Sequence, residues 1–302
     1  MFKSNNGMSR ALVRRETIAG YLFLLPSLFF FVTFVLYPMF MCIYTSLFDS
    51  NMGKNAVDVF VGLDNYKELF RDELFLGALK NTVVIVVVAV PTVCAFSLWV
   101  ATAIYDMKPA LTSAFRCIFY LPVVTGSVAV TVVWKWMYNN RYGVFNYLLK
   151  STGIIDQNIN WLGDARFALW CIILILFTTS VGQPIVLYVS ALSNVDHSLV
   201  EAAEVDGATN MQVFWRIKWP QIMPTTLYIL VITTINSFQC FALIQLLTSG
   251  GPNYATSTIM YYIYYEAFKL QRYGYGSAMG VILAIIIAVF SALQFRLAKS
   301  DQ

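Results

Sequence analysis

The chain has 302 residues, of which 59% are hydrophobic and only 12% charged, and it carries a net charge of +4. Soluble domains contain about 45–50% apolar and about 25% charged residues, and a soluble monomer of this composition would expose large apolar patches to water. The composition therefore excludes a soluble enzyme and a disordered chain. The small net charge excludes a nucleic-acid-binding protein, and a single histidine, His197, excludes a zinc cluster or a Ser-His triad.

Apolar runs long enough to cross a bilayer recur along the chain. A helix needs about 20 mostly apolar residues for this, and the six expected spans lie at residues 19–41, 81–104, 116–137, 167–192, 224–247 and 275–298. The sequence thus predicts an all-α polytopic membrane protein. Its expected parts are a cytoplasmic N-terminal segment at 1–18, a transmembrane domain of six helices at 19–298 and a cytoplasmic C-terminus at 299–302.

The distribution of Lys and Arg predicts the orientation of the spans. Lys3, Arg10, Arg14 and Arg15 precede the first span, whereas only Lys54 follows it closely. Because positive charge collects on the cytoplasmic side, the N-terminus is expected there, and six spans return the C-terminus to the same side. The long loop at 193–223 would then be cytoplasmic, and its length indicates a docking surface for a soluble partner.

The polar residues inside the spans are almost all uncharged. In the fifth span, side chains at i, i+3, i+4 and i+7 lie on one face of a helix, and these are Thr233, Asn236, Ser237 and Cys240. This face either bonds to a neighbouring helix or lines a watery path. The fourth span is interrupted by Gly182-Gln183-Pro184. No Asp or Glu lies well inside a span, which weakens the case for an ion-driven carrier and favours an uncharged solute.

The loop at 193–223 reads as two short helices. Two capping boxes are expected, Ser198 with Glu201 and Thr209 with Gln212. Gly207 suits the left-handed residue that ends the first helix. Pro220 is expected to stop the second helix, and Pro224 to open the fifth span.

The same loop resembles the EAA loop of ABC importer permeases, through the pattern E-A-A-x-x-D-G-A followed by F-x-x-I-x-x-P and a further proline. The matching residues are Glu201, Ala202, Ala203, Asp206, Gly207, Ala208, Phe214, Ile217, Pro220 and Pro224. Other stretches are similar to sugar permeases of the MalF/UgpA type, at residues 21–26, 37–38, 62–66, 81–82, 115–116, 121–122, 134–136, 143–146, 161–162 and 246–252. The resemblance implies a type I importer permease (MetI-like) fold with a cytoplasmic coupling helix.

The resemblance also implies a function, that of the permease subunit of an ATP-driven carbohydrate importer. The coupling helix would dock on the ATPase through Glu201, Ala202, Ala203, Asp206, Gly207, Ala208, Phe214 and Pro220, with Glu201 facing a basic residue. The sugar path would be lined by Val181, Gly182, Ile185, Thr233, Asn236, Ser237 and Cys240, which favours the pathway interpretation of the polar face. The expected partners are a second six-span permease subunit of the MalG/UgpE type, two cytoplasmic ABC ATPase subunits, an extracellular solute-binding protein and lipid of a bacterial or archaeal cell membrane.

No G-x-x-x-x-G-K-[ST] motif is present, so no cofactor is expected in this chain, and ATP and Mg would bind to the partner ATPase. The chain is therefore expected to be a transport subunit and not an enzyme. Three alternatives stay open. A secondary, ion-coupled transporter would need an intramembrane carboxylate or inverted repeats, an integral membrane lipid-sugar enzyme would need acids or a metal near an interface, and a structural membrane subunit would have no solute path.

Overall fold

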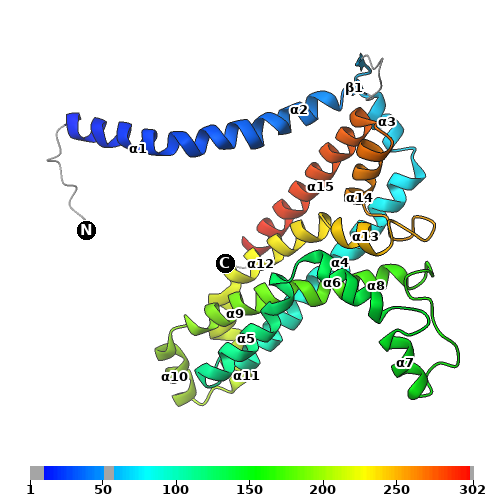
Figure 1. The fold of residues 1–302 in the computed structure, drawn as a ribbon. Coiled ribbons are helices and arrows are strands. Elements are labelled where there is room, and N and C mark those ends of the chain that lie inside the picture. Colours follow the sequence, from blue (N-terminus) through cyan, green and yellow to red (C-terminus); the bar gives the residue numbers. More distant parts are fainter. Residues whose placement is uncertain (1–9, 51–57, 300–302) are drawn as a thin grey trace.

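A computed structural model describes residues 10–50 and 58–299, and the side chains of 14–50 and 58–296. Lys3, Lys54, residues 300–302 and the first half of the segment at 1–18 lie outside these described residues. The described chain is mostly helical, in agreement with the predicted fold class (Figure 1). Two short strands, β1 (Phe48–Asp49) and β2 (Val59–Phe60), form one antiparallel pair in which Phe48 lies opposite Phe60.

The helices follow one another with short connections, and three π-helical turns, labelled η, lie within or beside them. In chain order they are α1 (Arg10–Phe31), η1 (Val32–Leu36), α2 (Tyr37–Thr45), α3 (Asp64–Leu69), α4 (Glu73–Ile104), α5 (Pro109–Val124), α6 (Ser127–Met137), α7 (Val144–Ser151), α8 (Ala168–Ser180), α9 (Gly182–Ser193), α10 (His197–Val205), α11 (Asn210–Val213), η2 (Phe214–Lys218), α12 (Trp219–Phe238), α13 (Ala242–Leu247), α14 (Ile259–Tyr264), η3 (Tyr265–Lys269) and α15 (Tyr273–Lys299).

Four helical stretches are long and apolar enough to cross a membrane unbroken, and these are Arg14–Thr45, Glu73–Ile104, Asn210–Leu247 and Tyr273–Arg296. The other two expected spans are bent pairs. Helices α5 and α6 meet at 95°, and α8 and α9 meet at 40°. The described chain therefore has four candidate spans, or six if each bent pair counts as one. The larger bend has a local cause, because Thr125 and Gly126 between α5 and α6 are both extended rather than helical.

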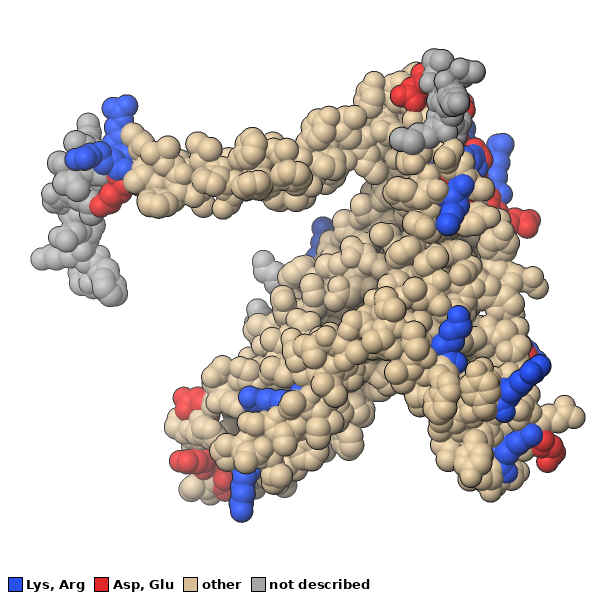
Figure 2. Space-filling view, in the orientation of Figure 1, with Lys and Arg blue, Asp and Glu red and all other residues tan. Residues whose placement is uncertain are grey.

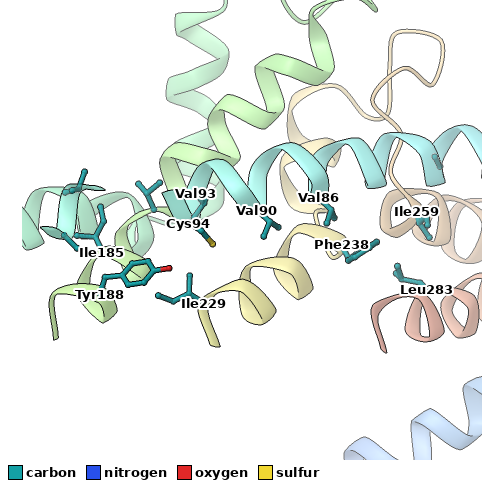
Figure 3. Packing of buried hydrophobic residues seen from close by; sticks show 14 of the residues in the cluster. Val86, Val90, Val93, Cys94, Ile185, Tyr188, Ile229, Phe238, Ile259 and Leu283 are labelled. Carbon is teal, nitrogen blue, oxygen red and sulfur yellow. The ribbon is translucent and has the colours of Figure 1, made fainter. Parts of the chain in front are cut away.

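Helix α4 lies at the centre of the packing, against α8, α9 and α12. Figure 3 shows Cys94 of α4 beside Tyr188 of α9, and Val86 of α4 beside Phe238 of α12. Helix–helix contacts in a membrane are stabilised by close packing rather than by removal of apolar groups from water. Charged side chains gather at the helix ends and in the loops on the face shown in Figure 2, as expected of a membrane-spanning body.

Helix α1 extends away from this body, whereas its continuation α2 packs on α15 (Figure 1). Every described side chain of α1 is exposed, and Phe23 is 86% exposed. An apolar helix exposed on all sides requires lipid or another protein around it.

Candidate functional site: a polar cavity and a hairpin

A polar cavity lies where the two bent pairs meet. Val123 borders it just before the α5–α6 bend, and Ser180, Gln183 and Pro184 border it around the α8–α9 bend. Pro184 has no N–H to donate to the carbonyl of Ser180, so the helix loses one hydrogen bond at this point. In a membrane such interruptions are tolerated where the backbone is buried in protein or borders a water-filled cavity.

The cavity has a volume of about 150 Å³, and no charged side chain lines it. Its lining consists of Val123, Thr179, Ser180, Gln183, Pro184, Leu187, Ile232, Thr233 and Asn236. The polar heads of Ser180, Gln183, Thr233 and Asn236 make no hydrogen bond to another described residue, whereas Thr179 donates to the carbonyl of Ile175 at 3.0 Å. The cavity thus offers unused, neutral hydrogen-bond donors and acceptors beside apolar walls. This is the chemistry that binds an uncharged polyhydroxylated solute.

The predicted pathway residues are not all at this cavity. Thr233 and Asn236 line it. Ser237 is 2% exposed and does not line it, and Cys240 lies beyond the end of α12, where its carbonyl accepts a hydrogen bond from Thr258.

The predicted residues of the fourth span pack inside the chain. Val181 and Ile185 belong to the main core. A Cβ at Gly182 would overlap the carbonyl oxygen of Phe119, so glycine is needed there for α9 to approach α5. None of the three lines the cavity.

Three polar lining residues were not among those predicted, namely Thr179, Ser180 and Gln183. Two signals pointed to them. Gln183 lies in the Gly-Gln-Pro interruption, and Thr178-Thr179-Ser180 is a polar run at the end of a long apolar stretch. A polar side chain beside the helix break is therefore a better indicator of this cavity than the glycine of the break.

A groove of about 470 Å³ adjoins the cavity through Gln183 and Leu187. Arg116, Cys117 and Tyr120 of α5 form its other wall. The Nε of Arg116 is buried and has no hydrogen-bond partner among the described residues. Arg116 is the only charged residue of α5, and it forms no ion pair with another described residue.

The second candidate site is the segment of residues 196–218, which we call the 196–218 hairpin. It consists of α10, α11 and η2 and lies at one end of the molecule (Figure 1). Asp196 is the N-cap of α10, because its carboxylate accepts hydrogen bonds from the backbone N–H and the hydroxyl of Ser198 at 2.9 and 2.7 Å. These bonds hold the pKa of Asp196 below its usual value. The expected capping box of Ser198 and Glu201 is therefore wrong.

The turn of the hairpin has the predicted geometry. Gly207 has φ +80°, a left-handed conformation that favours glycine. Thr209 and Gln212 form the expected capping box at the start of α11.

Pro220 does not end a helix, contrary to the prediction. Helical backbone runs without interruption from Asn210 to Phe238, through both Pro220 and Pro224. The π-helical turn Phe214–Lys218 ends two residues before Pro220, and its wider turn accommodates a ring that would clash in a regular α-helix.

Small residues leave a groove of about 450 Å³ between the two arms of the hairpin. It is lined by Ala203, Asp206, Gly207, Ala208, Gln212, Val213, Arg216 and Ile217. Glu201 and Ala202 are exposed beside it, Phe214 is half-buried, and Pro220 is exposed. Val205, at 88% exposure, is a large apolar side chain in water unless another protein covers it. The hairpin therefore presents a small-residue groove with both acidic and apolar edges.

Comparison with known proteins gives consistent matches over the chain. The model of the family described as "binding-protein-dependent transport system inner membrane component" matches residues 75–300. The probable ABC transporter permease protein YesP of Bacillus subtilis is 33% identical over 94% of this chain and 91% of its own length. The lactose transport system permease protein LacF of Rhizobium radiobacter is 32% identical over 96% of this chain and 97% of its own.

Among solved structures, the fold matches a chain of a bacterial alginate ABC transporter in complex with an alginate pentasaccharide-bound periplasmic protein. The TM-score is 0.82 and the identity 25%, over 95% of this chain and 96% of that one.

Proposed function

The chain belongs to the family of binding-protein-dependent transport system inner membrane components, and from this premise we propose how its two sites serve an ATP-driven carbohydrate importer. The chain is a permease subunit, a transport component and not an enzyme. In our proposal the polar cavity contacts the sugar, and the 196–218 hairpin docks on the ATPase.

The uncharged lining of the cavity is the observation that carries the solute assignment. Gln183, Thr233 and Asn236 offer amides and a hydroxyl that no described residue uses. A sugar needs several such partners, since its hydroxyl groups lose water on entering the site. The absence of charge from the lining favours a neutral sugar, such as the lactose named for one relative, over an acidic polymer such as the alginate named for the solved neighbour.

The cavity is one wall of a larger site. Its volume of about 150 Å³ is below the ~300–1,000 Å³ of pockets that enclose small-molecule ligands, and Asn236 faces out of the chain. A second six-span permease subunit of the MalG/UgpE type would supply the opposite wall. The exposed apolar surface of α1 and of the Arg116 groove is available to the same subunit or to lipid.

The hairpin is proposed as the coupling helix. Ala202, Ala203 and Gly207 keep its surface low enough for a cleft in the ATPase, and Glu201 would pair with a basic residue there. An exposed ion pair contributes only ~0.2–1 kcal/mol. Shape fit at Gly207 therefore matters more than the charge of Glu201. The partner ATPase subunits would bind ATP and Mg, and two of them would move two such hairpins.

These assignments imply an orientation of the chain in the membrane. With the hairpin in the cytoplasm, both termini lie there too, and α3, α7 and the loop before α14 lie outside, where an extracellular binding protein would deliver the sugar. The protein would be a multi-pass component of a bacterial or archaeal cell membrane.

Uptake into proteoliposomes tests the proposal. Vesicles would hold the complete complex with its binding protein and would be offered a panel of radiolabelled neutral mono- and disaccharides, with an alginate oligosaccharide for comparison. We expect uptake of a neutral sugar that requires ATP. Uptake driven by a proton gradient without ATP would overturn the proposal and favour the secondary transporter.

Paired substitutions on one helix test the cavity. Thr233→Val removes a hydroxyl from the lining, whereas Thr225→Val makes the same change two turns earlier on α12, away from the cavity. Loss of one neutral hydrogen bond is worth about 0.5–1.5 kcal/mol. Thr233→Val and Asn236→Ala should therefore lower uptake by about two- to tenfold, with normal ATPase association, and Thr225→Val should have no effect. Equal uptake by all three variants would remove the cavity from the solute path.

A further inference from the structure

The 196–218 hairpin has few attachments to the rest of the chain. Among the described residues, two hydrogen bonds that involve a side chain join it to other segments. The backbone N–H of Asp196 donates to Oε1 of Gln221 at a long 3.4 Å. Lys218 Nζ donates to Oη of Tyr105. All other side-chain hydrogen bonds of the hairpin are internal to it.

The bond between Lys218 and Tyr105 joins the end of the hairpin to the end of α4. Lys218 is the last residue of η2, and Tyr105 is the C-cap of α4, 113 positions away in the sequence. Both side chains are half-buried, so water competes for the bond less than it would at an open surface. Charge-assisted hydrogen bonds of this kind are stronger than neutral ones.

The surroundings favour a neutral tyrosine. A crevice of about 240 Å³ beside the bond is lined by Asp106, Glu201 and Glu204 as well as by Tyr105 and Lys218. Burial, followed by a hydrogen bond with Asp106 and the charges of Asp106 and Glu204, raises the pKa of Tyr105 above its usual value. The tyrosine hydroxyl is therefore protonated at neutral pH and can accept from Lys218, and three carboxylates line the crevice beside the two side chains.

Helix α4 connects this bond to the far end of the molecule. It runs without interruption over 32 residues and packs on α8, α9 and α12. At its other end, Asp72 accepts hydrogen bonds from Tyr262 and Tyr275 at 2.8 Å each, and Asn81 donates to the carbonyl of Ser257 at 3.0 Å. A displacement of Tyr105 would thus reach α14, the loop before it and the start of α15.

We propose that Lys218 and Tyr105 form a strut that carries movement of the hairpin to α4. Without the strut, the hairpin is joined to the membrane body by the chain itself, into α9 and α12, and by the packing on the core of Val200 and of the flanking residues Val195 and Trp219. With the strut, movement of the hairpin acts directly on α4 as well as on α9 and α12. This inference rests on the proposed coupling function of the hairpin.

The number of solute molecules transported per ATP hydrolysed, measured in proteoliposomes with the complete complex, tests the strut. Lys218→Met removes the donor and Tyr105→Phe removes the acceptor. Loss of the contact should lower this ratio by roughly two- to tenfold in each variant, equivalent to about 0.4–1.4 kcal/mol. Lys218→Arg, which keeps a donor, should retain most of it. The ATPase subunits should co-purify with every variant as with the wild type.

Two matched controls and the double variant complete the design. Lys108→Met removes another lysine near the same end of the molecule, and Tyr228→Phe removes an exposed hydroxyl of α12; neither side chain bonds to a described residue. Both should keep the wild-type ratio. Since the two strut residues act through one contact, the double variant should be no worse than the poorer single variant.

Each of the following outcomes would overturn the strut, and each has a different cause. Unchanged ratios in both single variants, or effects that multiply in the double variant, would show that the residues do not act through each other. Loss of the ATPase subunits from Lys218→Met would assign this residue to docking. Absence of ATP-dependent uptake in the wild-type complex would instead overturn the proposed function, and the strut with it.

Discussion

The segments that we place outside the membrane and the 196–218 hairpin are stabilised in opposite ways. The outer segments are fastened by buried amides. Asn146, 2% exposed, donates to the carbonyls of Asn140 and Ile159 and accepts from the backbone N–H of Ile159 and the indole of Trp161, at 2.9 to 3.2 Å. The hairpin, in contrast, has a single buried residue, Val213, and most of its hydrogen bonds are internal.

Other outer contacts repeat this pattern between segments far apart in the sequence. Asn65 donates to the carbonyls of Ser46 and Phe48 at 2.8 and 3.0 Å. Arg272 forms ion pairs with Glu68 at 2.6 Å and with the buried Glu266 at 3.2 Å. Buried polar groups bonded in this way fix one arrangement of the backbone.

The difference indicates which surfaces the chain completes alone. The outer segments bond most of their buried polar groups within the chain, with Oγ of Ser257 an exception among the described residues, so they suit the preorganised surface that the proposed function requires for a binding protein. The hairpin leaves a groove and an exposed Val205. In the proposed assembly the ATPase covers this surface, and the few attachments of the hairpin would let it move with that partner.

The largest expected effect comes from two glycines with the same geometry on the two sides. Gly207 has φ +80° and Gly153 has φ +71°, and a Cβ at either would meet no atom within 4 Å. Aspartate at each position introduces similar backbone strain. Because Gly207 lies in the proposed interface, Gly207→Asp should bury an unpaired charge there and weaken ATPase association by about 100-fold or more.

Gly153→Asp is the control for strain and should leave association unchanged. Association is measured by co-purification of the ATPase and by its affinity for the detergent-solubilised permease. If both variants lose the ATPase equally, strain rather than position is responsible, and the contrast between the two regions fails.

A smaller effect is expected from the outer amide Asn146. Asn146→Ala removes four hydrogen bonds and leaves buried backbone groups and an indole N–H unpaired, so the free energy of unfolding should fall by about 2–4 kcal/mol. Asn158→Ala removes one bond, to the carbonyl of Asn140, at an exposed side chain. It should change stability by less than about 1 kcal/mol.

Denaturant unfolding in detergent, followed by tryptophan fluorescence, measures both variants. Similar stabilities for Asn146→Ala and Asn158→Ala would mean that the outer loop is no better fastened than the hairpin.

Much of the fold could be predicted from the sequence, because the length of an apolar segment and the residues that cap a helix are local properties of the chain. The span expected at 81–104 lies within α4, and the capping box of Thr209 and Gln212 is present. The bends could not be predicted. Hydropathy does not distinguish a straight span from the pair α5–α6, in which Thr125 and Gly126 turn the chain by 95°.

Prediction of the sites was limited by the same distinction between local and long-range properties. The hairpin motif is contiguous, so its residues lie together as expected. The cavity is assembled from α5, α8, α9 and α12, and which residue of each helix faces it depends on the packing. Gly182 was expected on the sugar path, but it lies against the carbonyl of Phe119, while its neighbour Gln183 lines the cavity.

The smallest expected effect is a pH dependence that arises from the outer region. Burial opposes ionisation of Asp72, but hydrogen bonds from Tyr275, Tyr262 and two backbone amides outweigh it and hold the pKa of Asp72 below its usual value of about 3.8. A carboxyl with a lowered folded pKa contributes stability that is complete above the unfolded pKa. That stability is lost as the pH falls through the folded pKa.

Acidification below about pH 4 should therefore lower the thermal midpoint of the wild type by a few degrees more than that of Asp72→Asn, whose amide can still cap α4 but does not ionise in this range. Tyr275→Phe, which removes one donor, should lie between them, and Tyr273→Phe, whose hydroxyl bonds to no described residue, should follow the wild type. If Asp72→Asn keeps the full wild-type loss, Asp72 does not supply the acid sensitivity. The outer network would then be held by Arg272 and the buried amides, and its contrast with the hairpin would rest on those groups alone.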